Sequence, residues 1–135
     1  MHHKKALGTH LIIELYDCDE NKLNDEGFVE QAMLDATRES GATVISHTVH
    51  QFTPHGISGV VIIAESHVSI HTWPEYGYAA VDVFTCGDCI NPWAVEATLE
   101  RRLMAGNTSS MELKRGLFNR NRTEPLLHKP KIEKQ

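Results

Sequence analysis

Apolar and polar residues follow the spacing of β-strands in several parts of this chain. Residues 59–64 form an unbroken, mostly β-branched apolar run, which is typical of a buried strand. In residues 67–71, Val68 and Ile70 alternate with polar neighbours, so this strand is expected to have one polar face. The other predicted strands are residues 9–16, 42–52, 78–86 and 111–118.

Two segments have the spacing and end signals of helices. Asn24 or Asp25 can cap a helix that runs to about residue 40 and stops at Gly41. Its expected buried face consists of Phe28, Val29, Ala32, Met33 and Ala36. Asn91-Pro92 begins a second helix, because Pro suits the first helical position, and this helix is expected to reach about residue 105. Its apolar stripe is Val95, Leu99 and Leu103.

The resulting order is strand, helix, four strands, helix, strand. Short connections between the central strands favour antiparallel pairing, and two amphipathic helices can cover only one face of a sheet. We therefore predict a single α+β domain over residues 1–135, in two layers, with an antiparallel sheet and two helices on one face. The other face would need a cover, and a homodimer is the simplest one.

Composition narrows the class of protein. The chain has 41% hydrophobic residues, and no apolar run approaches the ~20 residues of a membrane span. The N-terminus lacks the apolar segment of a secretory signal, and three cysteines, an odd number, argue against a disulfide framework. These features favour a cytoplasmic protein with no membrane partner.

Charge is distributed unevenly along the chain. The net charge is −5, yet residues 119–135 carry five basic residues against two acidic ones, so the remainder is strongly acidic. An acidic body argues against nucleic acid as a partner and favours a cationic ligand. The 119–135 segment, with two prolines and few apolar residues, is predicted to be a mobile basic tail.

The candidate chemistry follows the buried strand directly. Residues 65–75 hold two carboxylates, two serines and two histidines, and buried polar groups without partners cost about 1–3 kcal/mol each. A serine at a strand end can attack the preceding peptide carbonyl if a hydroxyl stabilises the oxyanion and a base of near-neutral pKa is close. Ser66 suits the nucleophile, Ser58 the hydroxyl donor and His71 the base. Ser66 and His71 have opposite parity on a strand, so we expect a sharp bend at Ser66.

Four motifs resemble those of the prokaryotic, pyruvoyl-dependent S-adenosylmethionine decarboxylases, and the resemblance covers most of residues 8 to about 105. The motifs are Gly56-Ile57-Ser58-Gly59, Glu65-Ser66-His67, His71-Thr72-Trp73-Pro74-Glu75-Tyr76-Gly77-Tyr78 and Thr85-Cys86-Gly87. The resemblance implies self-cleavage between Glu65 and Ser66 into a β chain (1–65) and an α chain (66–135) headed by a pyruvoyl group made from Ser66. It also implies that Ser58 and His71 act in processing and that Cys86 is the catalytic proton donor.

The same resemblance implies the reaction. The pyruvoyl keto group would form a Schiff base with S-adenosylmethionine, carbon dioxide would leave, and the product would serve spermidine synthesis. Phe52 would stack on the adenine, with His71 on its other side, and Glu75 would accept the ribose hydroxyls. Glu65 is a further substrate-binding candidate, and the enzyme is expected to be a homodimer of processed αβ units.

Other functions, enzymatic and non-enzymatic, are also compatible with the sequence. The same cofactor could act on arginine or ornithine, or the chain could be a partner subunit that never cleaves. Ser66 and His71 could be a hydrolase pair, although no Gly-x-Ser-x-Gly elbow surrounds Ser66.

The spacing of histidines and cysteines raises two weaker hypotheses, a zinc site and a redox pair. His47 with His50, and His67 with His71, have helical ligand spacings but lie in predicted strands, so a zinc site is disfavoured and we predict no metal. Cys86 and Cys89 form a CxxC pattern outside the usual redox context. Cys18 is predicted to be structural.

Overall fold

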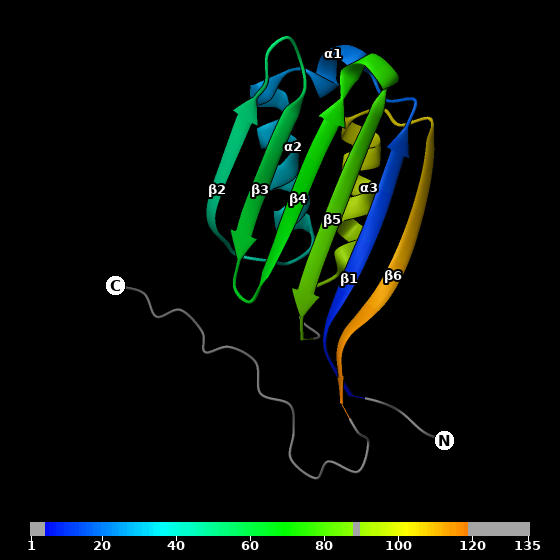
Figure 1. Ribbon diagram of the computed structural model, residues 1–135. Coiled ribbons are helices and arrows are strands. Elements are labelled where there is room, and N and C mark those ends of the chain that lie inside the picture. Colours follow the sequence, from blue (N-terminus) through cyan, green and yellow to red (C-terminus); the bar gives the residue numbers. More distant parts are fainter. Residues whose placement is uncertain (1–4, 88–89, 119–135) are drawn as a thin grey trace.

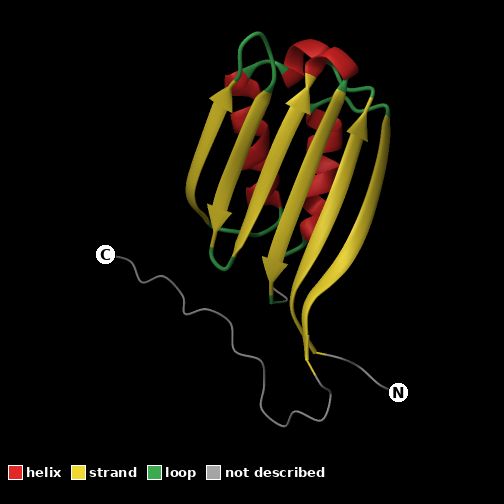
Figure 2. Cartoon of the chain, viewed as in Figure 1, coloured by secondary structure: helices red, strands yellow, loops and turns green. Residues whose placement is uncertain are grey.

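The computed structural model describes residues 5–87 and 90–118, which form one antiparallel sheet with its helices on one side (Figures 1 and 2). The strands are β1 (Lys5–Tyr16), β2 (Val44–Gln51), β3 (Ile57–Ile63), β4 (Ser66–Trp73), β5 (Tyr78–Cys86) and β6 (Asn107–Phe118). The helices are α1 (Glu20–Leu23), α2 (Glu26–Glu39), α3 (Pro92–Arg102) and the short 3₁₀ helix η1 (Pro74–Tyr76). The predicted two-layer α+β class is confirmed.

Strand order in the sheet is β2-β3-β4-β5-β1-β6, and every neighbouring pair is antiparallel. The consecutive strands β2 to β5 form a meander. The first strand, β1, lies between β5 and β6 and so joins the beginning of the chain to its end. The outer edges of the sheet are therefore β2 and β6.

The core lies between the sheet and the helices α2 and α3. Alternate residues of β4 are buried, including Val68 and Ile70, and β5 and β1 follow the same pattern, because successive side chains of a strand point to opposite faces. Asp25 caps α2 by accepting a hydrogen bond from the backbone N–H of Phe28, and Asn91 caps α3 in the same way. None of the helices in the described residues is long and apolar enough to span a membrane.

Several boundaries differ from those predicted, most of them by one or two residues and three by more. β1 begins at Lys5 and β6 at Asn107, each four residues earlier than expected, because the two strands pair along their full lengths from Tyr16↔Asn107 to Lys5↔Phe118. Residues 107–110 are polar and show no apolar alternation, so long-range pairing decides their conformation. α1 was not anticipated, and α3 ends three residues early, at Arg102.

The side of the sheet opposite α2 and α3 carries no helix among the described residues, and we call it the open face (Figure 2). It faces the viewer in Figure 1. Several large apolar side chains on it are about half exposed: Ile62, Trp73, Met111 and Leu113. An exposed apolar surface of this kind is typical of an interaction site, and the homodimer remains a prediction.

Candidate active site

The β3–β4 connection contains the predicted scissile bond. Ile63 pairs with Ser66, which leaves Ala64 and Glu65 as a two-residue turn. Glu65 has φ 63°, a left-handed conformation that costs a residue with a Cβ roughly 1–2 kcal/mol. Ser66 is the first residue of β4 and follows directly. The peptide bond between Glu65 and Ser66 therefore directly follows a residue whose backbone conformation is strained.

Ser66 is held against the end of β5. Its side chain is 8% exposed and points toward the helices, and its Oγ accepts a hydrogen bond from the backbone N–H of Cys86 at 3.1 Å. Cys86 pairs with Gly8 of β1, where an added Cβ would come within 2.9 Å of Phe84 and 3.3 Å of the Cys86 Sγ. Gly8 thus leaves room for the Cys86 thiol, which alternation along β5 directs to the open face, whereas Ser66 contacts the Cys86 backbone.

A hollow of about 600 Å³ opens beside Ser66. Its lining combines apolar side chains with acidic, basic and neutral polar ones: Ile45, Ile62, Ile63, Glu65, Ser66, His67, Phe84 and Arg115. The His67 ring stacks on Phe84 with centroids 5.9 Å apart, and the Arg115 guanidinium lies 6.0 Å from the centre of the same ring. Ser66 thus borders a hollow that offers a ligand aromatic, acidic and basic groups.

Ser58 and His71 form a second polar centre, on the open face. They are register partners on β3 and β4, and Ser58 Oγ lies 2.7 Å from His71 Nδ1, within hydrogen-bond distance. They border a hollow of about 290 Å³. A hydroxyl hydrogen-bonded to an imidazole can hold or transfer a proton near neutral pH.

A row of aromatic rings supports His71. Its ring lies 6.3 Å from that of Trp73, which stacks on Tyr78 at 5.3 Å. The Tyr78 hydroxyl donates a hydrogen bond to Glu14. Burial, then the neighbouring Glu14, raise the pKa of Tyr78, so the phenol stays protonated. The rings lie on β4 and β5, and Glu14 extends the row to β1; Trp73, Tyr78 and Glu14 were not among the predicted site residues.

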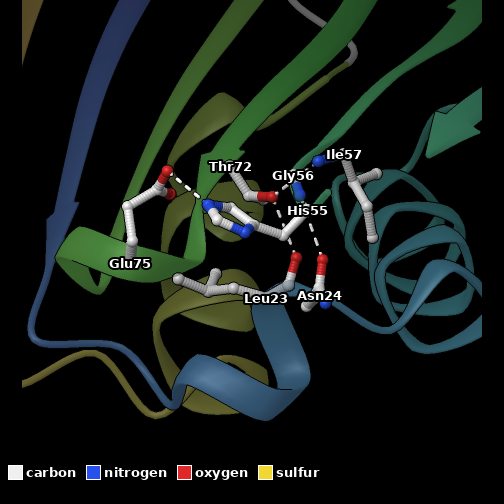
Figure 3. A network of polar contacts seen from close by, with 7 residues as sticks. All are labelled: Leu23, Asn24, His55, Gly56, Ile57, Thr72 and Glu75. Atoms are coloured by element: carbon white, nitrogen blue, oxygen red, sulfur yellow. Dashed lines mark hydrogen bonds and ion pairs between the residues drawn. The ribbon is translucent and has the colours of Figure 1, made fainter. Parts of the chain in front are cut away.

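Phe52 and Glu75 lie at the same end of the sheet as His71. Phe52 is 48% exposed, and its ring meets that of His50 edge-on at 4.6 Å. Glu75, on η1, contacts His55 with 2.6 Å between Oε2 and Nε2 (Figure 3). The pKa of Glu75 is lowered, first by its own backbone hydrogen bond and then by His55.

The candidate residues therefore form two separate groups. Glu65, Ser66 and Cys86 lie at the lower end of the sheet as drawn in Figure 1, where β3 turns into β4 and β5 ends. The second group, at the upper end, consists of Phe52, Ser58, His71 and Glu75. Five residues of strand separate Ser66 from His71, which is about 17 Å.

Two geometric expectations are wrong for a single chain. β4 runs without interruption from Ser66 to Trp73, paired with β3 on one side and β5 on the other, so no bend brings Ser66 and His71 to one face. The turn itself, at Glu65, precedes the serine. Ser58, predicted as the hydroxyl donor to Ser66, lies within β3 opposite His71, and it cannot reach Ser66 of its own chain.

Some residues near the site were not anticipated. Arg115 reaches the Ser66 hollow from β6, and no local pattern signals this, because it depends on the pairing of β6 with β1. His55 follows a Thr-Pro turn, and its partner lies twenty residues away.

The remaining candidate residues from the sequence do not contribute to either polar centre. Cys18 is buried in the core, and burial raises its pKa to about 11, as expected of a structural thiol. His47 contacts Glu30. Across residues 5–87 and 90–118, no three histidine, cysteine or acidic side chains gather where they could hold a metal ion. Cys89 and the 119–135 segment lie outside the described residues.

Comparisons with known proteins point to a single family. The family model of S-adenosylmethionine decarboxylase matches residues 9–116. A relative from Clostridium tetani named S-adenosylmethionine decarboxylase proenzyme is 54% identical over 112 residues, which cover 83% of this chain and 89% of the relative. A proenzyme of the same name from Thermotoga maritima is 49% identical over 115 residues, which cover 85% of this chain and 88% of the relative.

A solved structure agrees with the sequence relatives. The crystal structure of the adenosylmethionine decarboxylase from Aquifex aeolicus aligns with a TM-score of 0.81 and 34% identity, over 89% of this chain and 99% of that one. Together with the strained turn before Ser66 and the two polar centres, these matches show that the chain belongs to the S-adenosylmethionine decarboxylase family.

Proposed function

We propose that this chain is a proenzyme that cleaves itself between Glu65 and Ser66 and then decarboxylates S-adenosylmethionine. The observation that carries the proposal is the left-handed backbone of Glu65 directly before Ser66. The names of the relatives, proenzymes of an S-adenosylmethionine decarboxylase, support it. Cleavage would yield a β chain of residues 1–65 and an α chain of residues 66–135.

Cleavage can be written for the groups at the turn. The Ser66 Oγ attacks the Glu65 carbonyl carbon, the C–N bond breaks, and the Glu65 acyl group moves to the hydroxyl as an ester. A base removes the Ser66 α-proton, and the Glu65 carboxylate leaves from the β-carbon. The resulting dehydroalanine takes up water and releases ammonia, which leaves a pyruvoyl group on the α chain. The first step opens the turn and releases the strain at Glu65.

The base must come from a second copy of the chain. Ser66 lies about 17 Å along β4 from His71 and has its side chain on the other face of the sheet. A two-fold dimer formed through the open faces would set the partner's Ser58 and the partner's His71 against the Ser66 hollow, twice per dimer. The exposed apolar side chains of the open face support this homodimer.

The same arrangement assigns roles in the decarboxylation. A pyruvoyl group derived from Ser66 supplies a keto carbon for the substrate amine and an electron sink for the charge left when carbon dioxide departs. Cys86, whose backbone N–H donates a hydrogen bond to the Ser66 hydroxyl, returns a proton from its thiol to the substrate carbon. Phe52 stacks on the adenine, His71 lies on its other side, and Glu75 accepts the ribose hydroxyls. Glu65, which would be the last residue of the β chain, borders the hollow beside Ser66.

The product is decarboxylated S-adenosylmethionine, the aminopropyl donor for spermidine. A cytoplasmic location fits the buried Cys18 thiol, which forms no disulfide. Labelled arginine and ornithine are the substrates to compare, because a pyruvoyl group could act on either amine.

Intact mass under denaturing conditions tests the proposal. Freshly purified protein should give two fragments that break at Glu65–Ser66, with the C-terminal one lighter than its serine form by the mass of one ammonia, while Ser66→Ala should stay whole. The cleaved protein should release carbon dioxide from carboxyl-labelled S-adenosylmethionine and not from arginine or ornithine. A chain that stays uncleaved after long incubation would refute self-processing.

A further inference from the structure

The loop between β2 and β3 is fixed at several points, and it carries His55 (Figure 3). Within it, the Phe52 N–H donates to the Gly56 carbonyl at 2.8 Å, and the Gly56 N–H donates to Asn24 Oδ1 at 3.0 Å. His55 is therefore followed directly by a residue whose backbone N–H and carbonyl are both hydrogen-bonded.

A buried threonine anchors the end of this loop. Thr72 is only 5% exposed. Its hydroxyl accepts a hydrogen bond from the Ile57 N–H and donates one to the Leu23 carbonyl, both at 2.9 Å. These bonds join β3, β4 and α1 directly beneath His55. Buried and fully paired polar groups of this kind resist rearrangement.

Glu75 has much less support of its own. It lies on the three-residue helix η1, which ends at Gly77 with φ 60°, and its side chain is 38% exposed. A glutamate at the surface has several free rotations, and holding it in one orientation costs entropy. The two side chains in the 2.6 Å contact are similarly exposed, 37% for His55 and 38% for Glu75, and His55 differs in that the residue after it is hydrogen-bonded to Asn24 and Phe52.

The pair contributes little to stability. Both side chains are more than a third exposed, so solvent screens their attraction and the pair adds little to the free energy of unfolding. A contact this short between two exposed side chains is better explained by what it does to the carboxylate.

We propose that His55 is a positioning residue that holds the Glu75 carboxylate ready to receive the two vicinal hydroxyls of the substrate ribose. A carboxylate has two oxygens and about four lone-pair sites, so the contact with His55 Nε2 and the carboxylate's own backbone hydrogen bond still leave two sites available. Fixing the plane of the carboxylate before the substrate arrives removes an ordering cost from binding. The proposal rests on the proposed function, which assigns the ribose to Glu75.

The test compares His55→Leu, which removes the ring nitrogen, with His55→Gln, which retains a side-chain donor. His47→Leu is the matched control, because His47 makes a similar exposed contact with Glu30, at 3.1 Å and away from the candidate residues. Steady-state kinetics are measured on S-adenosylmethionine and on its 2′,3′-dideoxy analogue, with rates normalised to the cleaved fraction of each preparation.

We expect His55→Leu to raise KM for S-adenosylmethionine about tenfold with kcat unchanged, the loss expected when a charge-assisted hydrogen bond is misaligned. His55→Gln should recover part of this loss, and His47→Leu should change neither parameter. With the dideoxy analogue, His55→Leu and the unmodified enzyme should have the same KM, because no hydroxyls remain for Glu75 to accept.

Two results would overturn the inference while leaving the proposed function standing. One is an unchanged KM for S-adenosylmethionine in His55→Leu; the other is an equal rise for both substrates, which would indicate a structural role. If His55→Leu fails to fold, an unchanged ratio of the two KM values in His55→Gln refutes the inference equally. An unmodified protein that is cleaved but inactive on S-adenosylmethionine would instead refute the proposed function, and this inference with it.

Discussion

A site shared between two copies of the chain makes a distinctive prediction for mixed variants. Ser66→Ala cannot be cleaved but keeps His71, while His71→Ala keeps the cleavable serine. Alone, each variant should stay whole and inactive. Together, a mixed dimer contains one site with Ser66 from one copy and the partner's His71, and one site that lacks both.

The magnitude follows from the geometry. Ser66 and His71 of one chain are about 17 Å apart along β4, against the roughly 3 Å that proton transfer requires, so the proposed proton transfer could not take place within a single copy. With random pairing about half of the dimers are mixed, each with one intact site of two, so about a quarter of all sites should work.

Co-expression with different affinity tags, followed by purification through both tags, isolates the mixed dimer. Intact mass should then show cleavage only of the His71→Ala chain, and carbon dioxide release should reach about half of the activity of the unmodified dimer. Ser66→Ala co-expressed with Ser66→Ala/His71→Ala is the matched control and should be inactive. Complete inactivity of the first mixture, with the dimer intact, would refute the shared site.

Three further predictions concern single positions. Glu65→Gly should cleave about fivefold more slowly than Glu65→Ala in intact-mass time courses, because only the glycine adopts φ 63° without strain, and equal rates would show that strain does not drive cleavage. In the Ser66→Ala background, which keeps the chain whole, Thr72→Val should lower the free energy of unfolding by about 3 kcal/mol, because two buried backbone groups lose their hydrogen-bond partner. Thr72→Ser keeps the hydroxyl and should lower it by only about 1 kcal/mol. Similar urea midpoints for the two variants would contradict this. Hydrogen bonds from Gln31 and then Arg102 hold the pKa of Asp35 below its ordinary value. This pairing therefore stabilises the fold fully above the unfolded-state pKa of about 3.9, and the stabilisation is lost as the pH falls through the lower pKa of the folded state. Arg102→Gln should therefore cost roughly 0.5 kcal/mol at pH 7 and less at pH 3, and a loss independent of pH would refute the assignment.

Local patterns predicted the elements that local forces determine. Residues 78–86 match β5 at both ends, and Asp25 caps α2, because a strand alternation and a capping side chain are both encoded within a few residues. The extent of β6 was underestimated, since residues 107–110 are strand only because β1 lies beside them.

For the site, the sequence predicted the residue types but not their grouping. The odd spacing of Ser66 and His71 indicated opposite faces, and the expected bend, which would have removed that difference, is absent from β4. The contacts of Arg115 with Phe84 and of His55 with Glu75 depend on pairings far apart in the chain, which no local pattern encodes.

The place of β1 in the sheet has a consequence for the two cleavage products. The β chain would contribute β1, β2 and β3, and the α chain β4, β5 and β6, so β1 of one fragment lies between two strands of the other. The fragments would be interlocked: separating them means breaking β1 away from both β5 and β6, and β3 from β4. Unfolding of the mature protein would release two chains, so its recovery would become second order and its melting temperature would rise with protein concentration. Self-cleavage would thereby convert a fold that one chain can regain alone into one that two chains must find together.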